Sequence, residues 1–395
     1  MPSFPPPPPW VDEILTVGVT GTNGKSSTVR WIAAALGSLD DAVVAITTLG
    51  HQIGQRACSY PPTYAGFLEA MSRGRELGAR HAAIELTSAS LSVGFLRGWR
   101  CQVGVFTNLS QDHLDIHGSA EHYLASKAQL FLQLPPGGTA VLNRDDPASA
   151  LLEDVMGPGV KRLGYGCGDA GTADVMARDL RVTWEGTTAR LERTGRLSGL
   201  PDRLTVTAIG EVYVENALAA LLGAHAAGVP ADQAAAAIEA TPPPPGRFEV
   251  VSRKPAVIVD YAHTPDALQR TLATARQLCT GQLWVVTGAG GNRERAKRAP
   301  LGRAAAVADR IILTSDNPRG EDPTAIAAEL AAPLESHPSM VTVLDRRAAI
   351  AQALSQASAN DVILVAGKGH ERTQVDAQGS RQLSDVAVVR ELLDA

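Results

Sequence analysis

The chain has 395 residues, too many for one ordinary hydrophobic core, so two or three domains are expected. Its 36 basic residues against 41 acidic ones give a net charge of −5, which argues against binding to nucleic acid or to an anionic membrane. Hydrophobic residues make up 45% of the sequence, which excludes a disordered protein.

The chain shows no targeting or membrane-spanning segment. The first residues, MPSFPPPPPW, lack the charged start and the apolar core of a secretory signal. No apolar run approaches the roughly 20 residues that span a bilayer. The cysteines stand too far apart for a zinc ribbon and form no disulfide framework; they are Cys58, Cys101, Cys167 and Cys279. We therefore expect a cytoplasmic protein without a membrane partner.

Strand and helix patterns alternate after a proline-rich arm over residues 1–13. Short runs that are apolar on both faces predict buried parallel strands; they lie at residues 14–21, 41–49, 81–88, 101–109 and 138–146. Helices are predicted at about 26–36 and at 119–134, the latter with Ser119 as N-cap and Pro135 beyond its end. This alternation is typical of a parallel sheet covered by helices.

The pattern changes between residues 175 and 207, where short alternating strands predict an antiparallel patch added to the sheet. Two helices then follow, at 216–228 and 230–240. The segment Thr241–Phe248 carries four consecutive prolines, which cannot continue a helix or a strand ladder and mark a linker. Beyond it the alternation resumes, with buried strands predicted at 256–261, 282–288, 310–316, 340–345 and 361–367.

These patterns predict an α/β protein of two domains. Residues 14–244 would form a central domain built on a parallel sheet. Residues 245–395 would form a Rossmann-like α/β domain at the C-terminus.

A glycine-rich loop joins the first buried strand to the first helix, in VGVTGTNGKSST. Backbone N–H groups at such a junction cradle phosphates, Lys25 can reach the β- and γ-phosphates, and Ser26 can hold Mg²⁺. The usual spacing places a glycine where this chain has Val19, and an ordinary βα turn is the alternative interpretation. The residues predicted to bind the nucleotide are Gly21, Thr22, Asn23, Gly24, Lys25, Ser26 and Ser27. A kinase, a GTPase switch or a ligase could use such a loop.

Acidic and histidine residues follow the ends of two neighbouring strands. Glu85 ends one strand, and the loop after the next strand carries Asn108, Asp112, His113, Asp115 and His117. Open parallel sheets bind ligands at this edge, so Glu85 and His117 are predicted to hold a metal ion near the phosphates. Lys127 lies in the following helix, and its pattern alone does not distinguish it from a surface lysine.

The ordered set of motifs resembles the Mur ligases, most closely the MurE branch, which adds the third residue of the peptidoglycan stem peptide. The resemblance spans about residues 14–395 and rests on the phosphate loop, Glu85 and a series of later segments. These are FTNLSQDHLDIHG, YLASKAQLF, AVLNRDDP, PGRFEV, DYAHTPDAL, SDNPRGEDP and AGKGHE. The family phosphorylates a substrate carboxylate with ATP, and an amine then displaces phosphate from the acyl phosphate.

The resemblance also assigns residues to the ATP and metal sites. Ser26 and Glu85 would hold one Mg²⁺ ion, and His117 with a carbamoylated Lys127 would hold a second one. Asn108 and the stretch Asp112–Asp115, which includes His113, would shape the site between the two ions.

In the second domain, the resemblance implies that His263 and Asp266 face the nucleotide and that Arg247 is a hinge arginine. The incoming amino acid would be a diamino acid, because the DNPR and GKGHE motifs that go with meso-diaminopimelate are intact. Its expected contacts are Arg298, Asn317, Arg319, Gly367 and Glu371.

The sequence departs from the family on the acceptor side. The separate domain that binds UDP is not found ahead of residue 14. The family's T-T-P lies where this chain has Tyr60–Pro62, and S-S-H becomes Thr87–Ala89, in which Ser88 is still expected to bind substrate. A glutamine and an arginine that follow become Val93 and Phe95.

We therefore expect an ATP- and Mg²⁺-dependent ligase that joins an amino acid to a carboxylate or peptide acceptor without a UDP group. Its partners would be small molecules, and the chain would be a monomer or a weak homo-oligomer. Two alternatives stay open: a folylpolyglutamate synthetase-like ligase and a nucleotide-binding regulatory protein with an unused site.

Overall fold

The computed structural model describes residues 5–112, 114–168, 173–194, 197 and 199–394, and they divide into two compact units. The first consists of residues up to Ser110, Ile116–Arg181 and Glu185–Pro243, and the second of Gln111–Asp115, Val182–Trp184 and residues from Pro244 onward. Among the described residues, no helix has both the length and the apolar character needed to cross a membrane.

The first unit is built on a mixed sheet whose centre is parallel. Its described strands follow the order β11-β10-β9-β8-β7-β6-β1-β5-β2-β3-β4. Their bounds are β1 Leu15–Thr20, β2 Val44–Thr47, β3 Gly50–Ile53, β4 Arg56–Cys58, β5 His81–Glu85, β6 Val103–Phe106, β7 Thr139–Asn143, β8 Lys161–Gly166, β9 Val175–Thr183, β10 Gly186–Arg193 and β11 Arg203–Val206. The phosphate-loop strand β1 pairs in parallel with β5 and β6, so the ends of these three strands meet at one edge.

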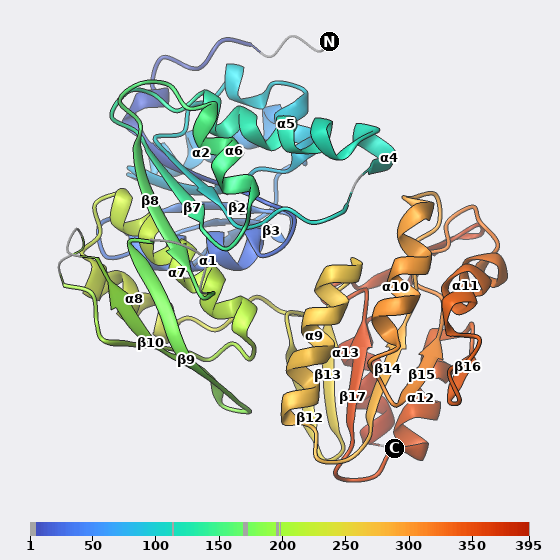
Figure 1. Cartoon of the computed structure of the whole chain (residues 1–395). Coiled ribbons are helices and arrows are strands. Elements are labelled where there is room, and N and C mark those ends of the chain that lie inside the picture. The colour runs from blue at the N-terminus through green and yellow to red at the C-terminus, as the bar shows by residue number, and fades with distance from the viewer. Residues whose placement is uncertain (1–4, 113, 169–172, 195–196, 198, 395) are drawn as a thin grey trace. The chain divides into compact units, whose positions relative to one another are not determined.

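Helices cover both faces of this sheet (Figure 1). The helices before the linker are α1 Lys25–Leu36, α2 Tyr64–Glu76, α3 Ser88–Ser92, α4 Leu114–His117, α5 Ala120–Leu132, α6 Ala148–Asp154, α7 Glu211–Ala226 and α8 Ala231–Ala240, with 3₁₀ turns at Val11–Glu13 and Phe95–Arg97. The helices α1, α7 and α8 pack together on one face. On the other face, Phe67 of α2, Leu130 of α5 and Leu152 of α6 share one hydrophobic core with the strands.

The second unit has a smaller sheet with the strand order β12-β13-β17-β14-β15-β16 and a separate hairpin, β18-β19. The strands are β12 Glu249–Arg253, β13 Ala256–Asp260, β14 Leu283–Thr287, β15 Arg310–Leu313, β16 Met340–Thr342, β17 Val362–Ala366, β18 Thr373–Asp376 and β19 Gly379–Gln382. The helices are α9 Pro265–Leu278, α10 Arg298–Ala305, α11 Pro323–Ala331, α12 Arg346–Gln356 and α13 Asp385–Leu393, with 3₁₀ turns at Arg295–Lys297 and Ala332–Leu334.

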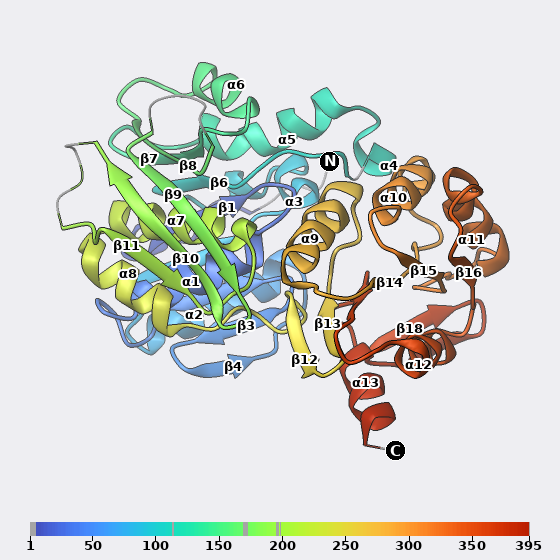
Figure 2. The same ribbon diagram turned by 60° about the horizontal axis from the view of Figure 1, so that its bottom comes forward.

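Two layers of helices also enclose this second sheet. Figure 2 shows α12 and α13 on one face and α9, α10 and α11 on the other. Ile350 of α12 and Val389 of α13 are fully buried in one core with Val257 and Ile363 of the sheet. Burial on both faces explains why the parallel strands read as continuous apolar runs in the sequence.

The predicted α/β class is confirmed, and the antiparallel patch is present as β10 and β11 at one edge of the large sheet. The predicted N-cap is also present, because the Ser119 hydroxyl accepts a hydrogen bond from the backbone N–H of His122. The apolar pattern did not indicate the hairpins β3-β4 and β18-β19, which consist largely of exposed or half-buried residues.

Both ends of the proline linker are attached to the unit beside them. On the first unit, the indole N–H of Trp31 donates to the carbonyl of Thr241 (2.9 Å), and Nε of Arg30 donates to the carbonyl of Pro242 (3.0 Å). On the second unit, the backbone N–H of Tyr261 donates to the carbonyl of Gly246 (3.0 Å). A Cβ atom on Gly246 would lie 2.1 Å from the backbone nitrogen of His370, so only glycine fits there.

Candidate functional site

The phosphate loop connects β1 to α1 and needs glycine at two positions. Gly24 is the N-cap of α1 with φ 86°, and a Cβ atom on it would lie 2.1 Å from Oδ1 of Asn216 on α7. A Cβ atom on Gly21 would lie 1.9 Å from Oγ1 of Thr107. The loop is therefore packed too closely for any side chain at these two positions, as expected for a loop whose backbone approaches a phosphate.

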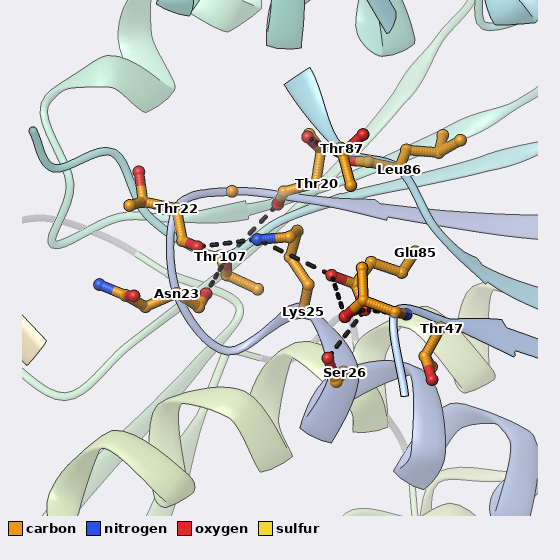
Figure 3. Close-up of polar contacts among 12 residues, drawn as sticks. Thr20, Thr22, Asn23, Lys25, Ser26, Thr47, Glu85, Leu86, Thr87 and Thr107 are labelled. Carbon is orange, nitrogen blue, oxygen red and sulfur yellow. Dashed lines mark hydrogen bonds and ion pairs between the residues drawn. The ribbon is translucent and has the colours of Figure 1, made fainter. Parts of the chain in front are cut away.

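The segment after β6 fixes the conformation of this loop. The side chain of Asn108 accepts from the backbone N–H of Asn23 (2.9 Å) and donates to its carbonyl (3.2 Å). The backbone N–H of Thr22 donates to the carbonyl of Asn108 (2.8 Å). Thr107 adds a hydrogen bond from its hydroxyl to the Asn23 carbonyl (2.7 Å), as Figure 3 shows. Asn108 thus orders the phosphate loop directly.

Lys25, Ser26 and Glu85 meet at the start of α1 (Figure 3). Nζ of Lys25 donates to the carbonyl of Thr22 (2.8 Å) and lies 3.9 Å from Oε1 of Glu85. The hydroxyl of Ser26 donates to Oε2 of Glu85 (2.8 Å). The Glu85 side chain is only 4% exposed. These two neighbouring oxygens are the hard ligands that Mg²⁺ prefers, so the pair fits the predicted ion.

Thr48 holds Glu85 from the other side. Its backbone N–H donates to Oε2 of Glu85 (3.2 Å), and its hydroxyl lies 3.3 Å from the same atom. Thr48 was not among the predicted site residues, because it lies in the loop between β2 and β3 with no distinguishing pattern of its own.

A chain of hydrogen bonds orients His117. The Ser126 hydroxyl donates to the carbonyl of His122 (2.8 Å), which can only accept. Since that hydroxyl has one proton, its contact with Nδ1 of His117 (3.3 Å) requires Nδ1–H to be the donor. The other ring nitrogen, Nε2, then accepts from the hydroxyl of Ser88 (2.9 Å). In a neutral ring, these hydrogen bonds favour the tautomer of His117 with its lone pair on Nε2, the form that binds a metal ion.

Replacing Ser126 with alanine is expected to remove the preference of His117 for the Nδ1–H tautomer. Without the acceptor at Nδ1, the neutral ring of His117 should show a mixture of the two tautomers in place of the Nδ1–H form. Ring ¹⁵N shifts measured by NMR at neutral pH would detect the change, and Ser126→Thr, which keeps the hydroxyl, should restore the wild-type signature. An unchanged Nδ1–H form in Ser126→Ala would show that Ser126 does not set the tautomer.

Lys127 is not a surface lysine, since it is only 1% exposed. Its Nζ donates to the carbonyl of Gly21 in the phosphate loop (2.7 Å) and lies 4.2 Å from the centre of the Tyr123 ring. The ring of His117 contacts the same tyrosine, with centroids 5.3 Å apart. The two side chains predicted to hold a second ion thus share one neighbour. Among the described residues, no group of three or more His, Cys, Asp or Glu side chains is placed to hold a metal ion.

Several residues predicted to bind the amino acid belong to one hydrogen-bonded cluster in the second unit. The amide of Asn317 donates to Oε2 of Glu371 (2.8 Å), and Nζ of Lys368 donates to the same oxygen (2.8 Å). Burial alone would raise the pKa of Glu371, but the contacts with Lys368 and Asn317 lower it below its ordinary value. Gly367 has φ 114°, and a Cβ atom there would lie 2.7 Å from Asp316. Lys368 was missed, although it lies inside the GKGHE motif.

The two predicted arginines of this pocket differ in their surroundings. Arg298 is 1% exposed, and its guanidinium contacts Glu321 (2.9 Å) and Glu329 (3.1 Å). Arg319 has φ 52° and donates from Nη1 to the carbonyls of Gly291 (2.9 Å) and Asn317 (3.2 Å). Within the part of the chain that the structure describes, Nη2 of Arg319 forms no hydrogen bond or ion pair, so this edge of the guanidinium could bind a carboxylate.

The residues predicted to face the nucleotide follow β13. The guanidinium of Arg247 lies 4.3 Å from the centre of the Tyr261 ring, and the ring of His263 packs edge-on against the same tyrosine (4.6 Å). Burial and the charge of Lys297 lower the pKa of His263 to about 4, although a third of its side chain is exposed, so the ring is neutral at neutral pH. Asp266 lies in the first turn of α9.

Asp112 belongs to the second unit, with the segment Gln111–Asp115. Its carboxylate lies 3.5 Å from Nζ of Lys297 and 3.9 Å from Nε2 of His263. The structure thus groups Asp112 with residues of the second unit. His113 lies outside the described residues.

Two family models match the chain. The model of the Mur ligase middle domain matches residues 19–224, and that of the Mur ligase glutamate ligase domain matches residues 246–369. A UDP-N-acetylmuramoyl-L-alanyl-D-glutamate–2,6-diaminopimelate ligase of Ralstonia nicotianae is 39% identical over 402 residues, which cover 98% of this chain and 77% of the relative.

Solved structures show the same fold. A structure of a ligase with that name superposes with a TM-score of 0.67 at 34% identity and covers 96% of this chain and 78% of its own. Folylpolyglutamate synthase of Mycobacterium tuberculosis, solved with ADP and AMPPCP, has a TM-score of 0.71 at 20% identity and covers 90% of this chain and 89% of its own. The phosphate loop, both domain matches and these relatives lead to one conclusion: the chain belongs to the Mur ligase family of ATP-dependent amide ligases.

Proposed function

We propose that this ligase forms an amide bond between an amino acid and a carboxylate acceptor through an acyl phosphate. The observation that carries the proposal is the cluster of Lys25, Ser26 and Glu85 at a loop built to approach phosphates. In this proposal residues 14–244 bind ATP, and residues 245–395 bind the amino acid.

The reaction would proceed in two steps. An oxygen of the acceptor carboxylate attacks the γ-phosphorus of ATP, the bond to the bridging oxygen breaks, and ADP leaves. The amine then attacks the carbonyl carbon, phosphate leaves, and the nitrogen loses a proton. Both steps bring anions together, and Lys25 supplies a positive charge at the place where charge develops.

Mg²⁺ would supply further charge neutralisation at this site. Ser26 and Glu85 would hold one ion, and His117 with a carbamoylated Lys127 would hold the other. Carbamoylation would convert the buried Lys127 ammonium into an anionic oxygen donor. The buried position of Lys127 beside the phosphate loop supports this assignment.

The amino acid is proposed to be a diamino acid such as meso-diaminopimelate. The open edge of Arg319 offers a planar, bidentate contact for a carboxylate. Glu371, which is ionised at neutral pH, offers a partner for a second ammonium group nearby. Asn317 donates a hydrogen bond to Glu371 and would hold this carboxylate at a fixed position relative to the guanidinium of Arg319.

The acceptor is proposed to be a carboxylate or peptide without a UDP group. Phe95, which replaces an arginine of the family pattern, is 9% exposed and packs against Phe67 (4.8 Å) and Tyr64 (5.7 Å). Tyr60 lies edge-on against His51 (5.6 Å). Aromatic packing thus occupies positions that would otherwise contact a polar acceptor.

A screen for phosphate release tests the proposal. With ATP and Mg²⁺, phosphate should appear only when an acceptor and an amino acid are both supplied. Lys127→Ala should lower the rate about 10–100-fold, as loss of a group that supports a metal site does, and short carboxylic acids should partly restore it. Lys161→Ala, at an exposed lysine of β8, is the control and should change nothing.

Three outcomes would contradict the proposal. Phosphate release that does not depend on the amino acid would contradict a ligase. Retained nucleotide binding with no turnover on any pair of substrates would favour the regulatory protein. Activity with glutamate and a folate-type acceptor alone would favour the folylpolyglutamate synthetase-like enzyme, whose fold the chain shares.

A further inference from the structure

The second unit contains an open cleft of about 720 Å³ beside the hairpin β18-β19. Four arginine side chains contribute to its lining: Arg347, Arg372, Arg381 and Arg390. A volume of this size is typical of a site for a small metabolite. None of these arginines has a part in the proposed ligase chemistry.

The carboxylates of the cleft neutralise only two of the four arginines. Arg347 forms an ion pair with Glu391 (2.6 Å), and Arg390 lies 3.8 Å from Glu249. A third carboxylate, Asp345, accepts from the backbone N–H of Ala348 (2.8 Å) and caps α12.

The other two arginines, Arg372 and Arg381, are exposed. Within the described residues, neither has a carboxylate within ion-pair distance. The cleft therefore has an excess of positive charge on the side of the hairpin.

The hairpin places these two arginines on one face. Thr373 pairs with Gln382, and the N–H of Leu383 donates to the carbonyl of Arg372, so Arg372 and Arg381 are diagonal neighbours. The side chains of such a pair begin about 7–8 Å apart and can reach one ligand.

Arg381 is also held in place before any ligand arrives. Its Nε and Nη2 both donate to Oε1 of Gln374 (3.1 and 2.6 Å). Gln374 is 1% exposed and is itself fixed by a hydrogen bond to the carbonyl of Asp316 (2.6 Å). A guanidinium that is already ordered loses less entropy on binding an anion.

We propose that this cleft binds a small molecule carrying phosphate or carboxylate groups, with Arg372 and Arg381 as its contacts. The guanidinium fork matches both kinds of anion with two parallel hydrogen bonds. The inference is independent of the amino acid and the acceptor that the ligase uses.

Calorimetric titration with inorganic pyrophosphate, and separately with citrate, tests the proposal on the full chain. A saturating non-hydrolysable ATP analogue occupies the phosphate loop throughout. Wild-type protein should show one further binding event with at least one probe. A response to pyrophosphate would identify a phosphate ligand, and a response to citrate would identify a carboxylate ligand.

The double variant Arg372→Gln/Arg381→Gln should weaken that binding about tenfold or more, because two charge-assisted contacts are lost. The matched control, Arg347→Gln/Arg390→Gln, removes the same charge from the same cleft but only from paired arginines, and should have a much smaller effect. Both variants should keep the wild-type affinity for the ATP analogue, which verifies folding. The absence of a second binding event, or an equal loss in both variants, would overturn the proposal.

Discussion

Lys25→Ala is expected to lower kcat/KM for ATP by about 10²–10³-fold, the loss typical when one preorganised group that stabilises developing charge is removed. Nζ of Lys25 lies 3.9 Å from Oε1 of Glu85 and donates a hydrogen bond to the carbonyl of Thr22 in the phosphate loop. Alanine is a strong helix former, so α1 should still begin at residue 25. Steady-state phosphate release at varied ATP would measure the effect.

Arg30→Ala is the control for this experiment. It removes a positive charge from the same helix, but its Nε contacts the linker carbonyl of Pro242 and not the phosphate loop. Its kcat/KM for ATP should stay within a few-fold of wild type. Equal losses in both variants would mean that net charge, and not the position of Lys25, accounts for the effect.

Arg346→Met should destabilise the second unit by about 3–5 kcal/mol, because it leaves the carboxylate of Asp385 buried without its partner. Both side chains are 0% exposed, and two parallel contacts of 2.7 and 2.8 Å join them. Burial alone would lower the pKa of Arg346, but Asp385 raises it above its ordinary value, so Arg346 stays charged. Hydrogen exchange of β13, β14 and β17 at increasing urea would report the loss for this unit.

The neighbouring residue provides a matched control. Arg347 forms its ion pair with Glu391 at the surface, where both side chains are at least half exposed. Water and salt screen such a pair, so Arg347→Ala should cost less than about 1 kcal/mol. A similar loss of protection in both variants would contradict the view that burial makes the Arg346–Asp385 pair matter.

The sequence predicted those features that depend on neighbours along the chain. Continuous apolar runs identified β1, β5 and β6, because strands buried on both faces leave no polar alternation. Glu85 could be placed at a strand end for the same reason. Ser119 was recognisable as a cap since its partner lies three residues away.

Contacts between distant segments were not predictable from these patterns. The burial of Lys127 depends on Gly21, 106 residues earlier in the chain, and nothing in its helix distinguishes it from an exposed lysine. Ser126 acts on His117 through a loop and not through helical spacing. Gln374 donates a hydrogen bond to the carbonyl of Asp316, 58 residues away in the chain. Its role in holding Arg381 could therefore be recognised only in the folded second unit.

The linker between the units has an entropic consequence. With Pro242 bound to Arg30 and Gly246 bound to Tyr261, only Pro243, Pro244 and Pro245 are left between the anchors. Their rings fix φ, and a following proline also restricts ψ, so this spacer of about 9 Å has few rotational states. Little backbone entropy is therefore lost whenever the two units adopt one defined orientation during a catalytic cycle.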